Sequence, residues 1–176
     1  MTVNLAAKRC SVSDIISLIF YPEELFTHER PHSVKQIMEE NASLHLQYGL
    51  DNSKMVILNY RGWMIEGIPD QIFEDEVVEG KVVRISSNVD KLMAIAWFQA
   101  GIYALALEKP RFRIVLFRNN DLSEYYSQEF TTKAEEPRIK MLLDYALEIL
   151  NAIRSLGRVG DQYARGAWRD GSLIQA

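Results

Sequence analysis

Three charged residues stand in apolar segments of the sequence, where a metal-dependent hydrolytic site would need them. Glu79 and Lys81 lie within the run VVEGKVV of residues 77–83, and Asp70 ends the segment GIPD of residues 67–70. Alternate side chains of a strand share a face, so Glu79 and Lys81 should emerge together, about 6.6 Å apart along the strand. Charges among valines are costly without partners. A divalent cation held by Asp70 and Glu79 would neutralise both acids and leave Lys81 beside a metal-bound water.

The predicted strands bring the two acids close together. Residues 63–73 and 76–85 are rich in Val and Ile and are separated by the short turn at residues 74–75, which predicts antiparallel neighbours. Asp70 lies four residues before that turn, and Glu79 lies four residues after it. A hairpin therefore sets the two acids across from each other, within reach of one ion.

Other elements surround this hairpin. Residues 11–48 are predicted to be helical, with Ser11 or Ser13 as a cap and a stop at Tyr21-Pro22. Strands are predicted over residues 55–59, 111–118 and 123–131, and a last helix is predicted to open at Pro137. This order predicts an α/β fold with a central mixed β-sheet flanked by helices, in which the first three strands form a meander.

A further helix is predicted over Asn88–Glu108, and it is apolar on nearly every side, as a buried helix is. It carries Gln99 and Tyr103, which the i,i+4 spacing places on one face. The two polar side chains could satisfy each other inside the core, or they could belong to a site.

Composition sets the class of protein. A chain of 176 residues can form one domain, and we expect residues 1–176 to be a single domain with a helical part at 11–48, a core at 55–118, and a C-terminal strand, helix and tail at 123–176. The 20 basic and 24 acidic residues give a net charge of −4, which argues against a generally basic nucleic-acid binder. No apolar run of about 18 residues predicts a membrane span, and no secretory signal is evident. We therefore expect a cytoplasmic protein with no membrane partner.

The pattern Asp…Glu-x-Lys on a β-hairpin resembles the PD-(D/E)xK nuclease superfamily. The upstream His45 and the helical pattern Gln99-x-x-x-Tyr103 resemble its RecB-like branch, which includes the Cas4 exonucleases. The resemblance covers roughly residues 11–118 and implies a restriction-endonuclease-like core. It also implies a DNA nuclease that hydrolyses phosphodiester bonds, with exonuclease action expected. DNA is the implied partner, and a homo-oligomer and a helicase or other DNA-processing protein are further candidate partners.

The resemblance assigns roles to individual residues. The implied cofactor is Mg²⁺ or Mn²⁺, with the Gly80 carbonyl among its ligands. The implied metal ligands are His45, Asp70, Glu79 and Gly80. The implied catalytic residues are Asp70, Glu79, Lys81, Gln99 and Tyr103, of which Lys81 is the catalytic lysine and the last two support the site or contact DNA.

The chain also departs from the Cas4 pattern, and other interpretations stay open. Cas4 proteins usually hold a four-cysteine iron–sulfur cluster, whereas this chain has only Cys10, so we expect no cluster. One alternative is a nuclease-fold DNA-binding or assembly subunit without catalytic activity. Another is a small α/β interaction protein with a chance motif, since 24 acidic residues give so loose a spacing many chances to occur. Further candidate DNA contacts are the arginines Arg111, Arg113, Arg118, Arg158, Arg165 and Arg169.

Overall fold

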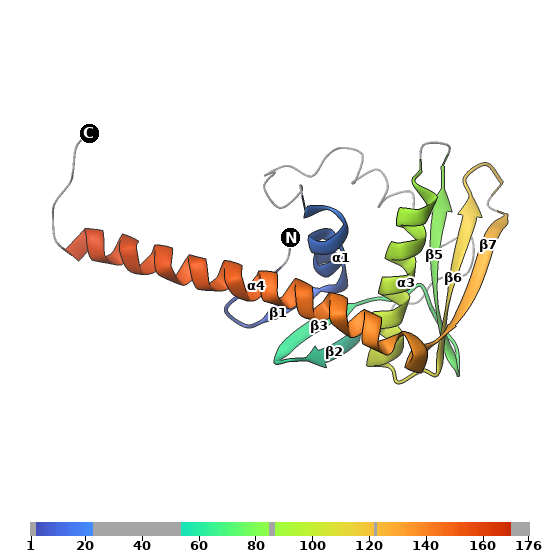
Figure 1. Ribbon diagram of the computed structural model, residues 1–176, viewed down its shortest axis with the longest axis horizontal. Helices are drawn as coiled ribbons and strands as arrows, with labels where there is room; N and C mark the ends of the chain where they lie inside the picture. The colour runs from blue at the N-terminus through green and yellow to red at the C-terminus, as the bar shows by residue number, and fades with distance from the viewer. Residues whose placement is uncertain (1–2, 23–53, 85–86, 122, 170–176) are drawn as a thin grey trace.

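A computed structural model describes residues 3–22, 54–84, 87–121 and 123–169, with the backbone alone described over 157–169. It is a mixed α/β structure in which helices pack on β-sheets, as the sequence predicted (Figure 1). The predicted N-terminal helix over 11–48 is described only as far as residue 22. The elements are β1 Arg9–Ser11, α1 Val12–Phe20, β2 Val56–Tyr60, β3 Trp63–Gly67, β4 Gln71–Ile72, β5 Glu76–Val83, α3 Val89–Ala106, β6 Arg111–Arg118, β7 Glu124–Thr131 and α4 Thr132–Arg169.

The strands form two sheets instead of one. The smaller sheet has the order β1-β3-β2, with β1 parallel to β3 and β2 antiparallel to it. Arg61 and Gly62 link β2 to β3 with positive φ angles of 48° and 75°, as a two-residue hairpin turn requires. The larger sheet has the order β4-β5-β6-β7, in which only the β5–β6 pair is parallel.

The prediction of one strand over residues 63–73 was wrong. The chain leaves the smaller sheet after Gly67 and enters the larger one at Gln71, so β3 and β4 belong to different sheets and the predicted meander does not form. The break falls at Ile68-Pro69-Asp70. Pro69 has no N–H for a strand ladder and restricts the backbone of Ile68, which explains why pairing stops there.

The helix α3 lies between α1 and the larger sheet and connects the parallel strands β5 and β6. It contacts both of these strands as well as β2, α1 and α4 (Figure 1). Asn88 caps it by accepting the Lys91 N–H at 3.0 Å. Phe98 and Ala100 are fully buried, so the prediction of a buried helix is confirmed.

The last helix is longer than predicted. It begins at Thr132, five residues before Pro137, and its backbone continues to Arg169 across the stretch that was expected to be a tail. The Thr132 N–H donates to the Pro110 carbonyl at 2.9 Å, which anchors the start of the helix. Figure 1 shows the far end of α4 extending clear of the sheets. Within the described ranges, no helix is both long enough and apolar enough to cross a membrane.

Cys10, in β1, is expected to resist alkylation while the protein is folded. The residue is 1% exposed, and burial, with smaller contributions from Asp14 and Glu66, raises its thiol pKa to about 12. The reactive thiolate should therefore be roughly a thousandfold scarcer than in an unfolded chain. Iodoacetamide labelling at pH 8, followed by mass spectrometry with and without urea, measures this ratio. Equal labelling rates would mean that β1 opens readily.

Candidate active site

Asp70 lies in the connection that carries the chain from one sheet to the other. The β4–β5 register pairs Gln71 with Val78, so its continuation sets Asp70 opposite Glu79, as the sequence predicted. Asp70 is 4% exposed, and its Oδ2 accepts the Gly80 N–H at 2.7 Å. The short strand β4 thus begins directly after Asp70, whose carboxylate accepts a hydrogen bond from the β5 backbone.

Glu79 and Lys81 share one face of β5. Their ladder partners on β6 are Ile114 and Leu116, which are buried on the face that α3 covers. Lys81 Nζ lies 2.7 Å from Glu79 Oε1, and the two side chains are 14% and 1% exposed. Glu79 Oε2 is buried without a hydrogen-bond partner among the described residues.

Burial and mutual charge shift the pKa values of Glu79 and Lys81. Burial, followed by the charge of Asp70, raises the pKa of Glu79 to about 8, although Lys81 opposes the shift. Burial lowers the pKa of Lys81, but the charges of Glu79 and Asp70 outweigh it and the net pKa is raised. The negative charges of Asp70 and Glu79 each raise the pKa of a neighbouring group, so positive charge placed beside them is stabilised.

Tyr103, on α3, lies within the electrostatic influence of the same carboxylates, and Gln99 hydrogen-bonds to it. Tyr103 is 3% exposed, and burial, followed by the charge of Glu79, raises its pKa above the ordinary value. Hydrogen bonds from the Gln99 side chain and the Ile68 backbone act in the opposite direction. Tyr103 of the predicted pair therefore lies near the acidic cluster, and the two side chains of the pair interact with each other.

Gly67 is the point at which β3 passes over Tyr103. A Cβ atom at Gly67 would come within 2.5 Å of the Tyr103 hydroxyl oxygen and 2.9 Å of its Cε1. Gly67→Ala is therefore expected to lower the free energy of unfolding by about 1–3 kcal/mol, because the buried ring has little room to move. Urea unfolding measures the change. Tyr103→Phe should relieve part of the clash, so additive effects of the two substitutions would contradict the proposed contact.

The described residues supply oxygen donors but no third acidic or histidine ligand. His45, the predicted upstream ligand, lies outside the described residues. Among the residues that are described, no group of three or more His, Cys, Asp or Glu could hold a metal ion. Continuing the β4–β5 register by one more residue sets Pro69 opposite Gly80. Since proline has no N–H, the ladder cannot supply a donor to the Gly80 carbonyl.

Tyr21 and Lys91 also belong to this region, although the sequence interpretation did not include them. The charge of Tyr21 contributes to the raised pKa of Lys81, and Lys91 Nζ lies 3.7 Å from the centroid of the Tyr21 ring. Tyr21 was treated only as a helix stop. Its proximity to β5 depends on tertiary packing, so no local signal could have revealed it.

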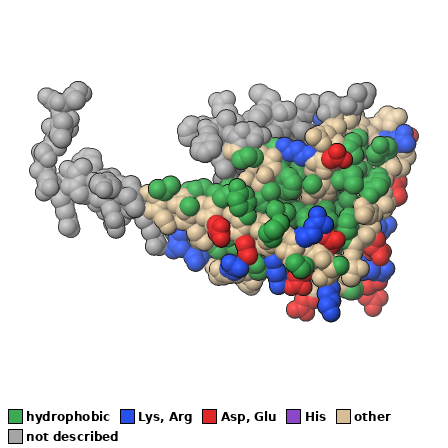
Figure 2. All heavy atoms as spheres, viewed as in Figure 1, with side chains coloured by type: hydrophobic (Ala, Val, Ile, Leu, Met, Phe, Trp, Pro, Cys, Tyr) green, Lys and Arg blue, Asp and Glu red, His purple; other side chains and the backbone are tan. Residues whose placement is uncertain are grey.

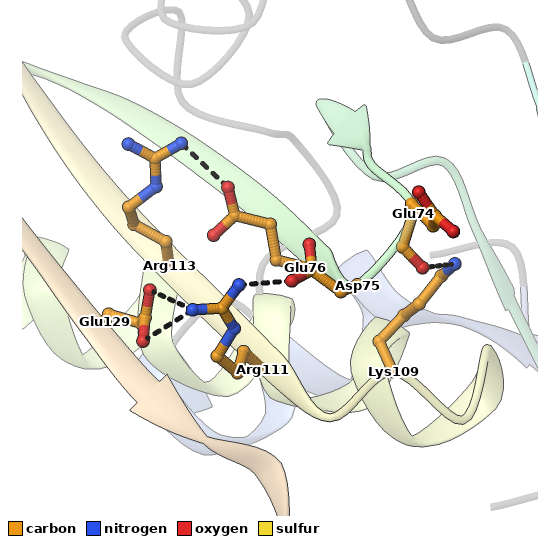
Figure 3. Close-up of polar contacts among 7 residues, drawn as sticks. All are labelled: Glu74, Asp75, Glu76, Lys109, Arg111, Arg113 and Glu129. Atoms are coloured by element: carbon orange, nitrogen blue, oxygen red, sulfur yellow. Dashed lines mark hydrogen bonds and ion pairs between the residues drawn. The ribbon is translucent and has the colours of Figure 1, made fainter.

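Arginines on the opposite face of the sheet are paired with carboxylates. Arg113 Nη2 contacts Glu76 Oε1 at 2.9 Å, and Arg111 lies between Asp75 and Glu129 and pairs with both (Figure 3). These pairs neutralise two of the arginines that the sequence offered as DNA contacts. Arg118, a third, lies over the ring of Tyr125 with 5.3 Å to the centroid.

Comparison with known proteins shows a fold likeness without a sequence match. No family model and no curated protein matched the chain. The structure of the protein SSO0001 matches with 18% identity and a TM-score of 0.53, over 82% of this chain and 77% of that one.

An alkaline exonuclease from Laribacter hongkongensis, LHK-Exo, matches with 10% identity and a TM-score of 0.50, over 89% of this chain and 95% of that one. Its complex with dAMP matches with 11% identity and a TM-score of 0.52, over 90% and 97%. This chain therefore has a mixed α/β fold similar to that of an exonuclease.

Proposed function

We propose that this chain is a metal-dependent DNA nuclease of the PD-(D/E)xK superfamily, in its RecB/Cas4-like branch. The observation that carries the proposal is the convergence of Asp70, Glu79 and Lys81 in a buried hairpin. Burying two carboxylates and a lysine together costs free energy, and such clusters are found more often at functional sites than elsewhere. The likeness to an exonuclease fold supports the same class of reaction.

The residues present suit a divalent cation such as Mg²⁺ or Mn²⁺. Glu79 Oε2, which has no hydrogen-bond partner in the described part of the chain, the Asp70 carboxylate and the Gly80 carbonyl are hard oxygen donors of the kind these ions prefer. Asp70, Glu79 and Gly80 would hold the ion, with His45 as a further ligand. When bound there, the ion supplies positive charge at the scissile phosphate and lowers the pKa of a coordinated water.

The remaining residues then have distinct tasks. The Lys81 ammonium, fixed by Glu79 at 2.7 Å, orients the attacking water or stabilises negative charge as it develops on the phosphate. Gln99 holds the Tyr103 hydroxyl in place, and Tyr103 closes the site beneath β3 or contacts the DNA. Because α3 covers the sheet, these groups act in a partly water-excluded environment, where charge interactions are stronger than in water.

A cleavage assay tests the proposal. End-labelled single- and double-stranded DNA is incubated with the protein in Mn²⁺, in Mg²⁺ and in EDTA, beside Asp70→Asn. We expect cleavage that requires metal and is lost in this variant, and the product ladder separates exonuclease from endonuclease action. Glu129→Gln, on the opposite sheet face, is the control and should cleave normally. Absence of cleavage by the wild type on every DNA substrate would contradict the proposal.

A nuclease-fold DNA-binding or assembly subunit without activity is the second candidate. The observation that favours it is that the chain itself partners much of the cluster, since Gly80 N–H meets Asp70 and Lys81 meets Glu79. Thermal unfolding with and without Mn²⁺ separates the two candidates. If the site binds the ion, Mn²⁺ should raise the unfolding temperature of the protein. A subunit without activity should bind DNA but show no such rise. Sedimentation of the same samples tests the expected homo-oligomer.

A further inference from the structure

A second lysine lies at the end of the larger sheet that carries Lys81. Because α3 joins the parallel strands β5 and β6, its first turn lies beside the C-terminal ends of these strands. Lys91 belongs to that turn, since α3 begins at Val89. Lys81 lies two residues before Val83, where β5 ends. The two lysines therefore lie at the same edge of the sheet, on different elements.

Tyr21, the residue that ends α1, interacts with both lysines. Lys91 Nζ lies 3.7 Å from the centroid of the Tyr21 ring, and this cation–π contact holds the ammonium in place. Tyr21 also lies close enough to Lys81 to contribute to its raised pKa. Tyr21 and Lys91 are both half-buried, so each keeps part of its surface open to solvent. The series Lys81, Tyr21, Lys91 therefore leads from the buried acids to the surface of the molecule.

The charge of Lys91 is not paired with a carboxylate among the described residues. Arg111 and Arg113 on β6, by contrast, both form ion pairs with acids. Asp90, which precedes Lys91, is exposed, and water weakens its attraction for the lysine. On the face that Figure 2 shows, hydrophobic side chains predominate and basic side chains are scattered among them. A single cation of fixed position is therefore important for attracting a polyanion.

We propose that Lys91, held by Tyr21, binds a second phosphate of the DNA strand whose scissile phosphate lies at Asp70, Glu79 and Lys81. The inference rests on the proposed nuclease function and adds that the strand is bound at a phosphate beyond the reacting one. A lysine binds phosphate as a point charge and does not read the base. The contact should therefore raise the affinity for DNA of any sequence.

The first test is the salt dependence of DNA binding by Lys91→Ala. Anisotropy of a fluorescent single-stranded oligonucleotide is measured in EDTA, where cleavage is prevented, over a series of salt concentrations. We expect binding about fivefold weaker than that of the wild type in 0.1 M salt, and a slope of log K against log salt that is smaller by about 0.7. In Mn²⁺, KM for cleavage should rise while kcat changes little, because the contact is away from the reacting atoms.

Lys133→Ala is the matched control. Lys133 also lies in the first turn of a helix, but α4 begins after Thr131, at the opposite end of the larger sheet from Lys91. The control variant removes the same charge and should keep the affinity, the salt slope and the KM of the wild type. Thermal unfolding of each variant confirms that it is folded.

A second test locates the phosphate. Oligonucleotides that carry one uncharged methylphosphonate linkage at successive positions are bound to the wild type and to Lys91→Ala. We expect one linkage whose neutralisation weakens binding to the wild type about fivefold but does not weaken binding to Lys91→Ala any further. Tyr21→Leu removes the ring that holds the ammonium and should lose part of the effect at that linkage. Tyr21→Phe keeps the ring and should retain more of the effect than Tyr21→Leu.

The outcomes separate this inference from the proposed function. If Lys91→Ala keeps the salt slope of the wild type, or if every linkage that matters to the wild type matters equally to the variant, the phosphate contact of Lys91 is wrong. Metal-dependent cleavage by the wild type would still stand in that case. If the wild type neither binds nor cleaves DNA, the proposed function fails and this inference fails with it.

Discussion

Replacing Lys81 with methionine is expected to lower the free energy of unfolding by about 3 kcal/mol in EDTA near neutral pH. Methionine fills a similar volume but removes the cation that lies 2.7 Å from Glu79. The carboxyl groups of Asp70 and Glu79, which are 4% and 1% exposed, would then lose the ammonium that lies beside Glu79. Urea unfolding measures the change. Mn²⁺ is expected to restore part of the lost stability, because a divalent ion supplies the missing positive charge.

Lys109→Met serves as the control for that experiment. The Lys109 ammonium donates to the Glu74 carbonyl at 2.7 Å on an exposed part of the molecule (Figure 3), so its loss should change stability by only about 0.5 kcal/mol. If Lys81→Met lowered the free energy of unfolding by less than about 1 kcal/mol, the buried acids would not need the charge of this lysine for stability. Equal responses of the variant and the wild type to Mn²⁺ would contradict the placement of the ion beside it.

Glu79→Gln is expected to abolish metal-dependent cleavage, with a loss of roughly a thousandfold or more in kcat/KM. The amide keeps the shape of the side chain and still offers Lys81 an acceptor, but it lacks the negative charge that a divalent ion requires. The variant should also lose the rise in unfolding temperature that Mn²⁺ gives to the wild type. Initial rates on end-labelled DNA and thermal unfolding scans with and without the ion measure both effects.

The two readouts for Glu79→Gln separate catalysis from folding. A folded variant that binds DNA but neither cuts it nor responds to Mn²⁺ is the expected result. Glu129→Gln, which changes a carboxylate that pairs with Arg111 on the opposite face, should leave both readouts intact. Cleavage by Glu79→Gln at the wild-type rate would place the reaction at a different site.

Local sequence signals were sufficient for much of this fold. The strand over residues 111–118 and the buried helix α3 follow directly from periodicity and from the flanking Asn88 and Pro110. Ser11, one of the two caps that the sequence predicted, caps α1 and pairs with Asp14 in a capping box. Counting residues from the turn at 74–75 also predicted that Asp70 lies opposite Glu79, in agreement with the β4–β5 register. This works because the register of a hairpin is set by its own turn and strands.

Features that depend on tertiary contacts were not predicted. The division into two sheets arises at Pro69. In the sequence, however, the apolar residues of 63–73 have the pattern of one continuous strand. The three-residue strand β1 is too short to show a period, and it pairs with β3, more than fifty residues away. The early start of α4 depends on the contact between Thr132 and Pro110 rather than on a capping sequence. The contribution of Tyr21 to the site has the same origin.

The break at Pro69 has a consequence for the order in which the protein folds. Asp70 and Gly80 are ten residues apart, so their hydrogen bond closes within a small loop that can form in microseconds. The β5–β6 pair, by contrast, joins residues 35 positions apart across the whole of α3, and closing that loop is slower. The acidic hairpin can therefore take shape before the parallel sheet does. When α3 then docks on the sheet, it buries charges whose spacing is already set. Replacement of Lys81 should therefore affect this last packing step more than the earlier ones.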